Sequence, residues 1–212
     1  MIFVCAMTMA QTNAYPLLPM PQNYKVTDKS FAMGKVKLST PVLKSEWEAF
    51  IVNAGGELAD KAAAEIKIEL LPVIDGVKLN PDEAYRLSVS GKLIKIEAVT
   101  ERGVYWALQT LRQLEKKKGK KSLFAGCEIV DWPAFRIRGF MQDVGRSYIS
   151  VEELKREIEI LSRFKINVFH WHLTENQAWR LESKIFPMLN DSINTVQTLG
   201  CTSITLPLLF WM

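Results

Sequence analysis

The stretch RGFMQDVGRSYISVEELKREIEILSRFKINVFHWHLTENQAWRLESKIFPML, residues 138–189, decides how the C-terminal part of this chain folds. Residues 136–144 alternate with a period of two, which predicts a strand. Ser150 lies three residues before Glu153, a spacing typical of a capping box, and apolar side chains then recur at helical spacing. Residues 167–173, rich in Val, Phe and Trp, predict a second strand. Strand, helix and strand in this order predict a βαβ unit with parallel strands, the opening of a parallel barrel.

Polar and aromatic side chains follow both predicted strands, where such barrels carry their functional residues. Asp143 and Arg146 follow the first strand, and His172, Glu175 and Trp179 follow the second. These residues are therefore candidates for a site. Asp143 can equally anchor its loop, and Trp179 can serve packing as well as a pocket. Arg146 is expected to pair with a nearby carboxylate.

Several spaced identities in this stretch carry a family resemblance. The pattern R-G-x-M-x-D-x-x-R, then K-x-N-x-F-H-W-H-L-T, Q-A-W-R-L-E and F-P-x-L, resembles glycoside hydrolase family 20, the β-N-acetylhexosaminidases. Upstream, RGVYWALQTL (102–111) resembles the last helix of the small domain that precedes the barrel in this family. DWP (131–133) resembles the junction. The resemblance spans roughly residues 16–190, weakly at first and strongly at the end.

The resemblance implies a fold and a set of sugar contacts. It implies an α+β N-terminal domain followed by a TIM (β/α)8 barrel, incomplete here. It implies that Arg138 grips hydroxyls of a terminal N-acetylhexosamine, for which a permanently charged donor fork is suited. Glu175 and Asn176 stand where the family usually has two aspartates beside the sugar pocket, so the contact of Glu175 differs from the usual one.

The resemblance also implies a mechanism. In the family the substrate's own acetamido oxygen attacks the anomeric carbon with overall retention, while an adjacent Asp–Glu pair from the fourth barrel strand orients the acetamide and transfers protons. Residues 192–212 contain no Asp or Glu, so we expect this chain to lack the catalytic pair and to be inactive by itself. The implied partner is a glycan ending in N-acetylhexosamine, and no metal or organic cofactor is implied.

Other interpretations remain open. The chain could be a non-catalytic carbohydrate-binding piece that keeps Arg138, or a structural module built on the small domain. From the residues alone, Arg138 could be a salt-bridge arginine. His170 and His172 point to one side of their strand, but a metal site needs a third ligand and none is close in sequence. His172, nearer the strand end, is therefore the candidate for a pocket-lining role.

Residues 16–131 read as a separate α+β domain with an antiparallel sheet and helices on one side, and residues 132–190 as the first βα units of the barrel. Residues 65–70 alternate as a strand, and residues 85–89 and 93–98 predict a hairpin. Ser45 and Glu48 form a predicted capping box, and a second helix is expected over 103–115. The lysine-rich run 116–121 is expected to be a solvated helix end and loop.

Composition and the two terminal segments give further expectations about partners and location. A net charge of +4 does not argue for nucleic acid, and three cysteines at 5, 127 and 201 show no framework spacing. Residues 1–15 resemble a partial signal peptide, which predicts a secreted or periplasmic protein. Residues 191–212 are expected to be an aberrant or truncated tail, too interrupted by Pro207 to span a bilayer.

Overall fold

The computed structural model describes residues 16–175 and 178–190, which divide into two compact units at the Arg136–Ile137 boundary. We call them the N-terminal unit and the C-terminal unit. The signal-like segment 1–15 and the tail 191–212 lie outside the described residues. No helix in the described part of the chain is long and apolar enough to cross a bilayer.

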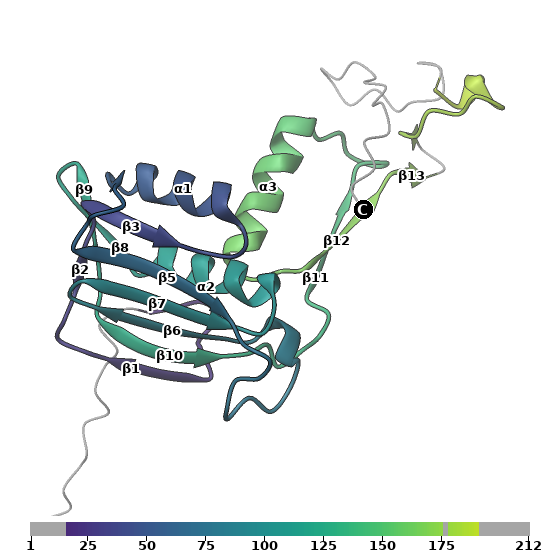
Figure 1. Ribbon diagram of the computed structural model, residues 1–212. Helices are drawn as coiled ribbons and strands as arrows, with labels where there is room; N and C mark the ends of the chain where they lie inside the picture. The colour runs from purple at the N-terminus through teal and green to yellow at the C-terminus, as the bar shows by residue number, and fades with distance from the viewer. Residues whose placement is uncertain (1–15, 176–177, 191–212) are drawn as a thin grey trace, which may run out of the picture. The chain divides into compact units, whose positions relative to one another are not determined.

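A mixed sheet forms the body of the N-terminal unit (Figure 1). Its order is β1 (Asn23–Val26), β10 (Cys127–Asp131), β6 (Tyr85–Ser90), β7 (Leu93–Ala98), β5 (Ala64–Leu70), β3 (Lys35–Ser39) and β4 (Glu57–Leu58). The first four strands in this order pair antiparallel, whereas β7, β5, β3 and β4 pair parallel. The predicted β6–β7 hairpin and strand β5 are confirmed. The expectation of an antiparallel sheet is wrong, because strand direction depends on pairings between segments far apart in sequence.

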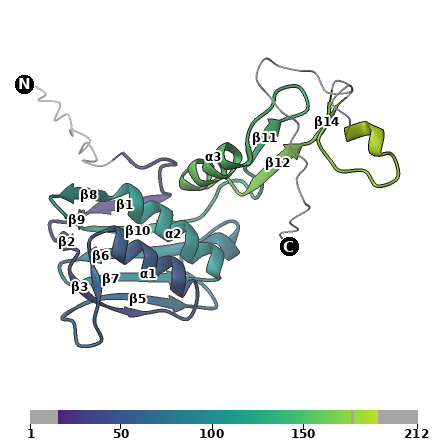
Figure 2. The ribbon, with the colours of Figure 1, turned by 90° about the horizontal axis from the view of Figure 1, so that it is seen from above.

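Both helices of this unit pack on one face of the sheet (Figures 1 and 2). Helix α1 (Lys44–Asn53) contributes Trp47 and Ile51 to the core, and α2 (Glu101–Gln113) contributes Leu108 and Leu111. The strands alternate, so that every second residue meets the helices while the opposite face carries charges. The prediction of helices on one side is confirmed.

The start of α1 differs from the prediction. The residue preceding the helix is Leu43, in the left-handed conformation with φ 53°, and it makes no side-chain capping bond. Ser45 Oγ donates instead to the neighbouring Glu46 carboxylate at 2.9 Å. The predicted capping box at Ser45 is therefore wrong. Helix α2 has a true cap, because Thr100 Oγ1 accepts a hydrogen bond from the backbone N–H of Arg102 at 3.2 Å.

A smaller sheet of β2 (Phe31–Ala32), β9 (Lys121–Phe124) and β8 (Glu115–Lys118) completes the N-terminal unit. The lysine-rich run is thus a β-hairpin and not the predicted helix end and loop. Its inner residues Ser122 and Phe124 are buried. Pro81–Glu83 forms one turn of 3-10 helix, η1, before β6.

The C-terminal unit begins with the predicted βαβ unit. Strand β11 (Gly139–Asp143) pairs parallel with β12 (Val168–His172), and α3 (Val151–Arg163) connects them. The Ser150–Glu153 capping box is confirmed with both of its reciprocal bonds. A short hairpin of β13 (Thr174–Glu175) and β14 (Ala178–Trp179) follows, then the 3-10 turn η2 (Pro187–Asn190). The described residues show this βαβ unit and not a barrel.

Candidate functional site

The parallel pairing of β11 with β12 brings the two strand ends together. The register places Asp143 directly opposite His172, and the backbone N–H of Val144 donates to the carbonyl of His172 at 3.0 Å. Opposite residues in a parallel pair point to the same face of the sheet. Asp143 and His172 therefore lie on one face at the C-terminal edge, as the strand-end rule predicts.

The loop after β11 fixes the Asp143 carboxylate. Oδ1 accepts hydrogen bonds from the backbone N–H of Gly145 at 2.9 Å and of Arg146 at 3.1 Å. Oδ2 accepts from Nε of Arg146. The Arg146 side chain, with the two backbone donors, lowers the pKa of Asp143, and the carboxylate raises the pKa of Arg146 in turn. The predicted carboxylate partner of Arg146 is thereby identified, and Asp143 anchors its loop while remaining at the site.

His172 lies between two carboxylates. Its Nδ1 is 3.6 Å from Oδ2 of Asp143, and its Nε2 is 3.8 Å from Oε2 of Glu175. Both distances exceed those of direct hydrogen bonds, so the contacts are electrostatic or bridged by water. His170 lies on the same face of β12, with a ring-centroid distance of 6.3 Å to His172. The imidazole of His172 connects the acidic groups that follow the two strands.

Close backbone approach holds Glu175 beside the loop. A Cβ added at Gly145 would lie 2.9 Å from the Cβ of Glu175, so any larger residue would push the loop and β13 apart. Glu175 pairs with Ala178 in the β13–β14 hairpin, and Thr174 pairs with Trp179. Trp179 is half-buried, and its indole N–H is buried without an acceptor among the described residues. The hairpin thus carries Glu175 and Trp179 together.

Arg138 lies at the other end of the same strand. It precedes β11, at the opposite end of the strand from Asp143, and its Nε donates to the carbonyl of Lys165 at 2.6 Å. Its backbone N–H donates to Oδ1 of Asn167 at 2.9 Å. It is five positions from Asp143 along the chain, a span of roughly 17 Å at the usual rise per residue. The cation bonded to Asp143 at the strand end is Arg146.

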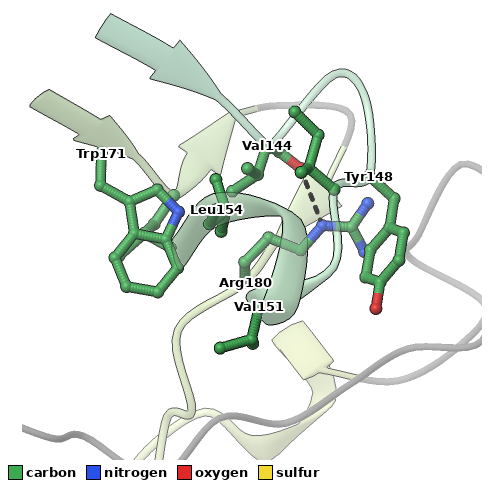
Figure 3. Close-up of a pocket in the computed structure, with 8 residues that line it drawn as sticks. Val144, Tyr148, Val151, Leu154, Trp171 and Arg180 are labelled. Atoms are coloured by element: carbon green, nitrogen blue, oxygen red, sulfur yellow. Dashed lines mark hydrogen bonds between the residues drawn. The ribbon is translucent and has the colours of Figure 1, made fainter. Parts of the chain in front are cut away.

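An apolar pocket lies on the other face of the strands (Figure 3). Trp171 lines it with Val151 and Leu154 of α3, as expected for a side chain that alternates with the two histidines. Arg180 closes one side, because its Nε donates to the carbonyl of Val144 at 3.0 Å. Its guanidinium lies over the ring of Tyr148, 5.9 Å from the centroid. This pocket is the layer between helix and strands rather than the polar site.

The described residues contain no cluster of three or more His, Cys, Asp or Glu side chains suited to a metal ion. Cys127 is buried in the N-terminal unit, and burial raises the pKa of its thiol to about 12, so it is not a reactive thiolate at neutral pH. The chemistry available at the strand ends is that of carboxylates, one imidazole and one guanidinium.

Comparison with known families decides which proteins this chain resembles. The model for glycosyl hydrolase family 20, domain 2, matches residues 14–132, more than half of the chain, and the model for the catalytic domain of the same family matches residues 135–199. The chain belongs to glycosyl hydrolase family 20. The resemblance inferred from the sequence motifs is confirmed. The family 20 catalytic-domain match covers the whole strand-end group of Asp143, Arg146, His172 and Glu175.

Similar proteins are β-hexosaminidases from several organisms. The chain is 34% identical over 200 residues to a β-hexosaminidase of Porphyromonas gingivalis, covering 87% of this chain and 26% of that protein. It is 39% identical over 132 residues to one from Vibrio furnissii, covering 62% of this chain and 21% of that protein. The chain therefore spans about a quarter of the length of these curated relatives.

Solved structures of family 20 enzymes share the fold. An exo-β-N-acetylglucosaminidase from Vibrio harveyi in complex with N-acetylglucosamine aligns with a TM-score of 0.70 and 36% identity, over 84% of this chain and 28% of that one. A β-N-acetylhexosaminidase from Bacteroides fragilis aligns with a TM-score of 0.69 and 29% identity, over 82% and 36%. In each case the likeness covers the small domain and only part of the larger enzyme.

Proposed function

We propose that the C-terminal unit supplies part of the subsite for a terminal N-acetylhexosamine in a retaining β-N-acetylhexosaminidase that acts on glycans. Membership of family 20 and the names of the relatives support this proposal. The observation that carries it is the convergence of Asp143, Arg146, His172 and Glu175 at one edge of the parallel strands. Sugar hydroxyls both donate and accept hydrogen bonds, so a site with fixed acceptors beside a cationic donor suits them.

Within that subsite we assign the sugar-gripping guanidinium to Arg146 in place of Arg138. The Arg146 side chain is 58% exposed and is held at Nε by Asp143, which leaves its terminal nitrogens for other acceptors. A guanidinium oriented in this way can donate to two neighbouring hydroxyls. Arg138 instead ties the start of β11 to the carbonyl of Lys165.

Glu175 provides the acceptor of the subsite, and His172 orients it. The Glu175 carboxylate lies next to the His172 imidazole, which is itself beside Asp143. Glu175 is one methylene longer than the aspartate usual in the family, and the missing Cβ at Gly145 gives its backbone the room to approach the loop. Trp179, paired with Thr174 in the same hairpin, is assigned to the wall of the subsite.

The hydrolytic step itself needs groups from elsewhere in the family fold. Residues 137–175 and 178–190 contain no adjacent Asp–Glu pair, the pair that holds the substrate acetamide and transfers protons in the proposed mechanism. We therefore propose that this chain, by itself, binds the sugar without turning it over. We also propose that the protein is secreted or periplasmic, on the signal-like sequence of residues 1–15.

Saturable binding of N-acetylglucosamine, measured by isothermal titration calorimetry on the full chain, tests the proposal. We expect a Kd on the order of 1 mM, which corresponds to about 4 kcal/mol of binding free energy. Arg146→Gln should weaken it at least about tenfold, because a charge-assisted hydrogen bond is lost. Arg138→Gln is the matched control and should change the Kd by less than about twofold.

The competing functions predict different results. A structural module without sugar affinity would show no saturation with the wild-type chain. If Arg138→Gln lost affinity for N-acetylglucosamine and Arg146→Gln kept it, the sugar contact would be assigned to Arg138. Turnover of a chromogenic N-acetyl-β-glucosaminide by the chain would show that the acid–base groups are present after all.

A further inference from the structure

The hairpin of β8 and β9, residues 115–124, carries five lysines and one acidic side chain in ten residues. Its pairing register places Lys118 opposite Lys121, Lys117 opposite Ser122 and Lys116 opposite Leu123. Because side chains alternate between the faces of a strand, Lys116, Lys118 and Lys121 share the face opposite that of buried Ser122 and Phe124. We call Lys116, Lys118, Lys120 and Lys121 the lysine face, with Lys120 in the turn.

The single acidic residue of the hairpin, Glu115, contacts residues of the inner face and not the lysine face. Glu115 pairs with Nζ of Lys117 at 2.7 Å and also accepts a hydrogen bond from Oγ of Ser122. Nζ of Lys117 further donates to the carbonyl of Asn53 at 2.9 Å. Across the part of the chain that the structure describes, Lys118, Lys120 and Lys121 have no carboxylate within ion-pair distance. The charges of these three lysines are therefore not neutralised by carboxylates of the described residues.

The direct opposition of Lys118 and Lys121 is unfavourable by itself. Like charges at directly opposed positions of an antiparallel pair destabilise it. A bound anion between them would turn this repulsion into attraction.

The hairpin is also held rigidly, as a binding surface requires. The backbone N–H of Ser122 donates to the carbonyl of Ala54 at 3.0 Å, and β9 pairs with β2. A Cβ added at Gly55, where φ is +76°, would lie 2.1 Å from the carbonyl oxygen of Lys120. The turn therefore packs on the end of α1 so closely that only glycine fits there. Such docking reduces the conformational entropy that binding would otherwise cost.

We propose that the lysine face binds an acidic polysaccharide, through the carboxylate or sulfate groups that recur along such a chain. Side chains two residues apart on one strand leave the backbone about 7 Å apart, and those of opposite residues about 5 Å apart, which allows several anionic groups of one extended polymer to be contacted together. The hairpin exposes no large apolar side chain, so it has nothing to insert into a bilayer. Its one aromatic residue, Phe124, is buried and cannot stack on nucleic-acid bases.

Binding of polygalacturonate tests this assignment on the full chain. The polymer has carboxylates but no N-acetylhexosamine, so its binding does not depend on the sugar subsite, and the two proposals can fail separately. We expect saturable binding in biolayer interferometry that weakens steeply as salt rises from 0.05 to 0.5 M, roughly the range over which the Debye length falls from about 14 to 4 Å. Neutral dextran should not bind.

Two double variants of equal net charge locate the surface. Lys118→Glu with Lys120→Glu reverses two charges of the lysine face and places a glutamate opposite Lys121, which favours the hairpin. Lys61→Glu with Lys92→Glu makes the same change at exposed positions outside the hairpin. Each takes the formal net charge from +4 to 0, since every replacement changes it by two.

The first double variant should bind polygalacturonate at least about tenfold more weakly than the wild type, and the second within about twofold. Circular dichroism melting confirms that both remain folded. Equal losses in the two variants would overturn the proposal, because net charge alone would then explain binding. Absence of binding by the wild type, or tighter binding of single-stranded DNA or of phosphatidylglycerol vesicles, would overturn it as well.

Discussion

The two units of this chain hold their residues in place by different means. The N-terminal unit buries a continuous core between one sheet face and two helices, with residues such as Trp47, Ile94 and Leu108 inaccessible to solvent. In the C-terminal unit, large apolar side chains of α3, β11 and β12 are exposed, among them Met141, Ile158 and Val168. Its site is fixed instead by local polar bonds, in the turn around Asp143 and in the capping box at Ser150. Precise local geometry therefore coexists here with an open apolar surface.

The largest effect that this comparison predicts concerns proteolysis. A two-stranded sheet with one helix is marginal in water, whereas the N-terminal sheet has a closed core. Limited digestion with thermolysin should remove the C-terminal unit on the order of a hundredfold faster than the N-terminal unit. Mass spectrometry of the surviving fragment should place its end near residue 136. A resistant fragment that extends to residue 190 would contradict the comparison.

Truncation of one isoleucine in each unit sharpens the contrast. Ile96 is fully buried between β6, β5 and the helices, so Ile96→Ala should lower the free energy of unfolding by about 2–5 kcal/mol. Ile158 is 45% exposed on α3, and Ile158→Ala should change it by less than about 0.5 kcal/mol. Urea unfolding followed by far-ultraviolet circular dichroism measures both. Similar losses would mean that α3 is packed in solution.

The next largest effect concerns the capping box at Ser150, because this local bond stabilises a helix that buries few apolar side chains. Ser150→Ala removes the side-chain acceptor for the backbone N–H of Glu153 at 3.2 Å and should cost about 1 kcal/mol of helix stability. Ser45→Ala is the control in α1, where no such cap exists, and should cost only a few tenths of a kcal/mol. Amide hydrogen exchange in the first turn of each helix reports the difference. If the first turn of α1 exchanged faster in the Ser45 variant than in the wild type, Ser45 would cap α1 as the sequence pattern predicted.

The smallest effect concerns the charged face of the N-terminal sheet. Nζ of Lys95 bonds Glu97 at 2.6 Å, and Arg86 pairs with the same carboxylate at 3.1 Å. Lys95 first, and then Arg86, lower the pKa of Glu97. A carboxyl whose pKa is lowered by folding stabilises the protein above its unfolded pKa, near 4.3, and loses that contribution as pH falls through the lowered value.

Glu97→Gln should therefore lower the free energy of unfolding by about 0.5–1 kcal/mol at pH 7. The difference from wild type should shrink as the pH falls below about 4 and vanish below the lowered pKa of Glu97. Glu128→Gln is the control, because its ion pair with Lys25 is long, at 3.9 Å, and exposed. Thermal melting across pH 3–7 gives both curves. A constant difference at all pH values would assign the effect to packing rather than to charge.

Sequence patterns predicted the elements whose signals are local. Strand β5 and the β6–β7 hairpin alternate over five or more residues, and the Ser150 box is a four-residue signal. Strands β1 (NYKV) and β8 (EKKK) carry little apolar alternation, because they lie at or near sheet edges. The parallel pairing of β5 with β3 and β7 depends on contacts between distant segments and has no local signature.

The sequence placed the candidate site residues at the strand ends, and the identity of the sugar-binding cation stays a prediction. Asp143, His172 and Glu175 follow strand ends, and the parallel register brings them together. Arg138 and Arg146 flank the same strand, and only the direction of β11 shows which one lies at the polar edge. Similarity of short motifs predicts the sugar contact at Arg138, whereas our proposal from the order along the strand assigns it to Arg146.

The place of β10 in the sheet has a consequence for how the protein is made. Strand β1 begins at residue 23, yet its neighbour is β10, whose residues 127–131 are translated about a hundred residues later. At about 5–20 residues per second, β1 must wait roughly 5–20 s on the ribosome before its partner emerges. During that time the segment that will close one edge of the sheet remains available to other chains or to chaperones. The rate of synthesis therefore sets how long β1 is exposed to wrong partners before the N-terminal unit can fold.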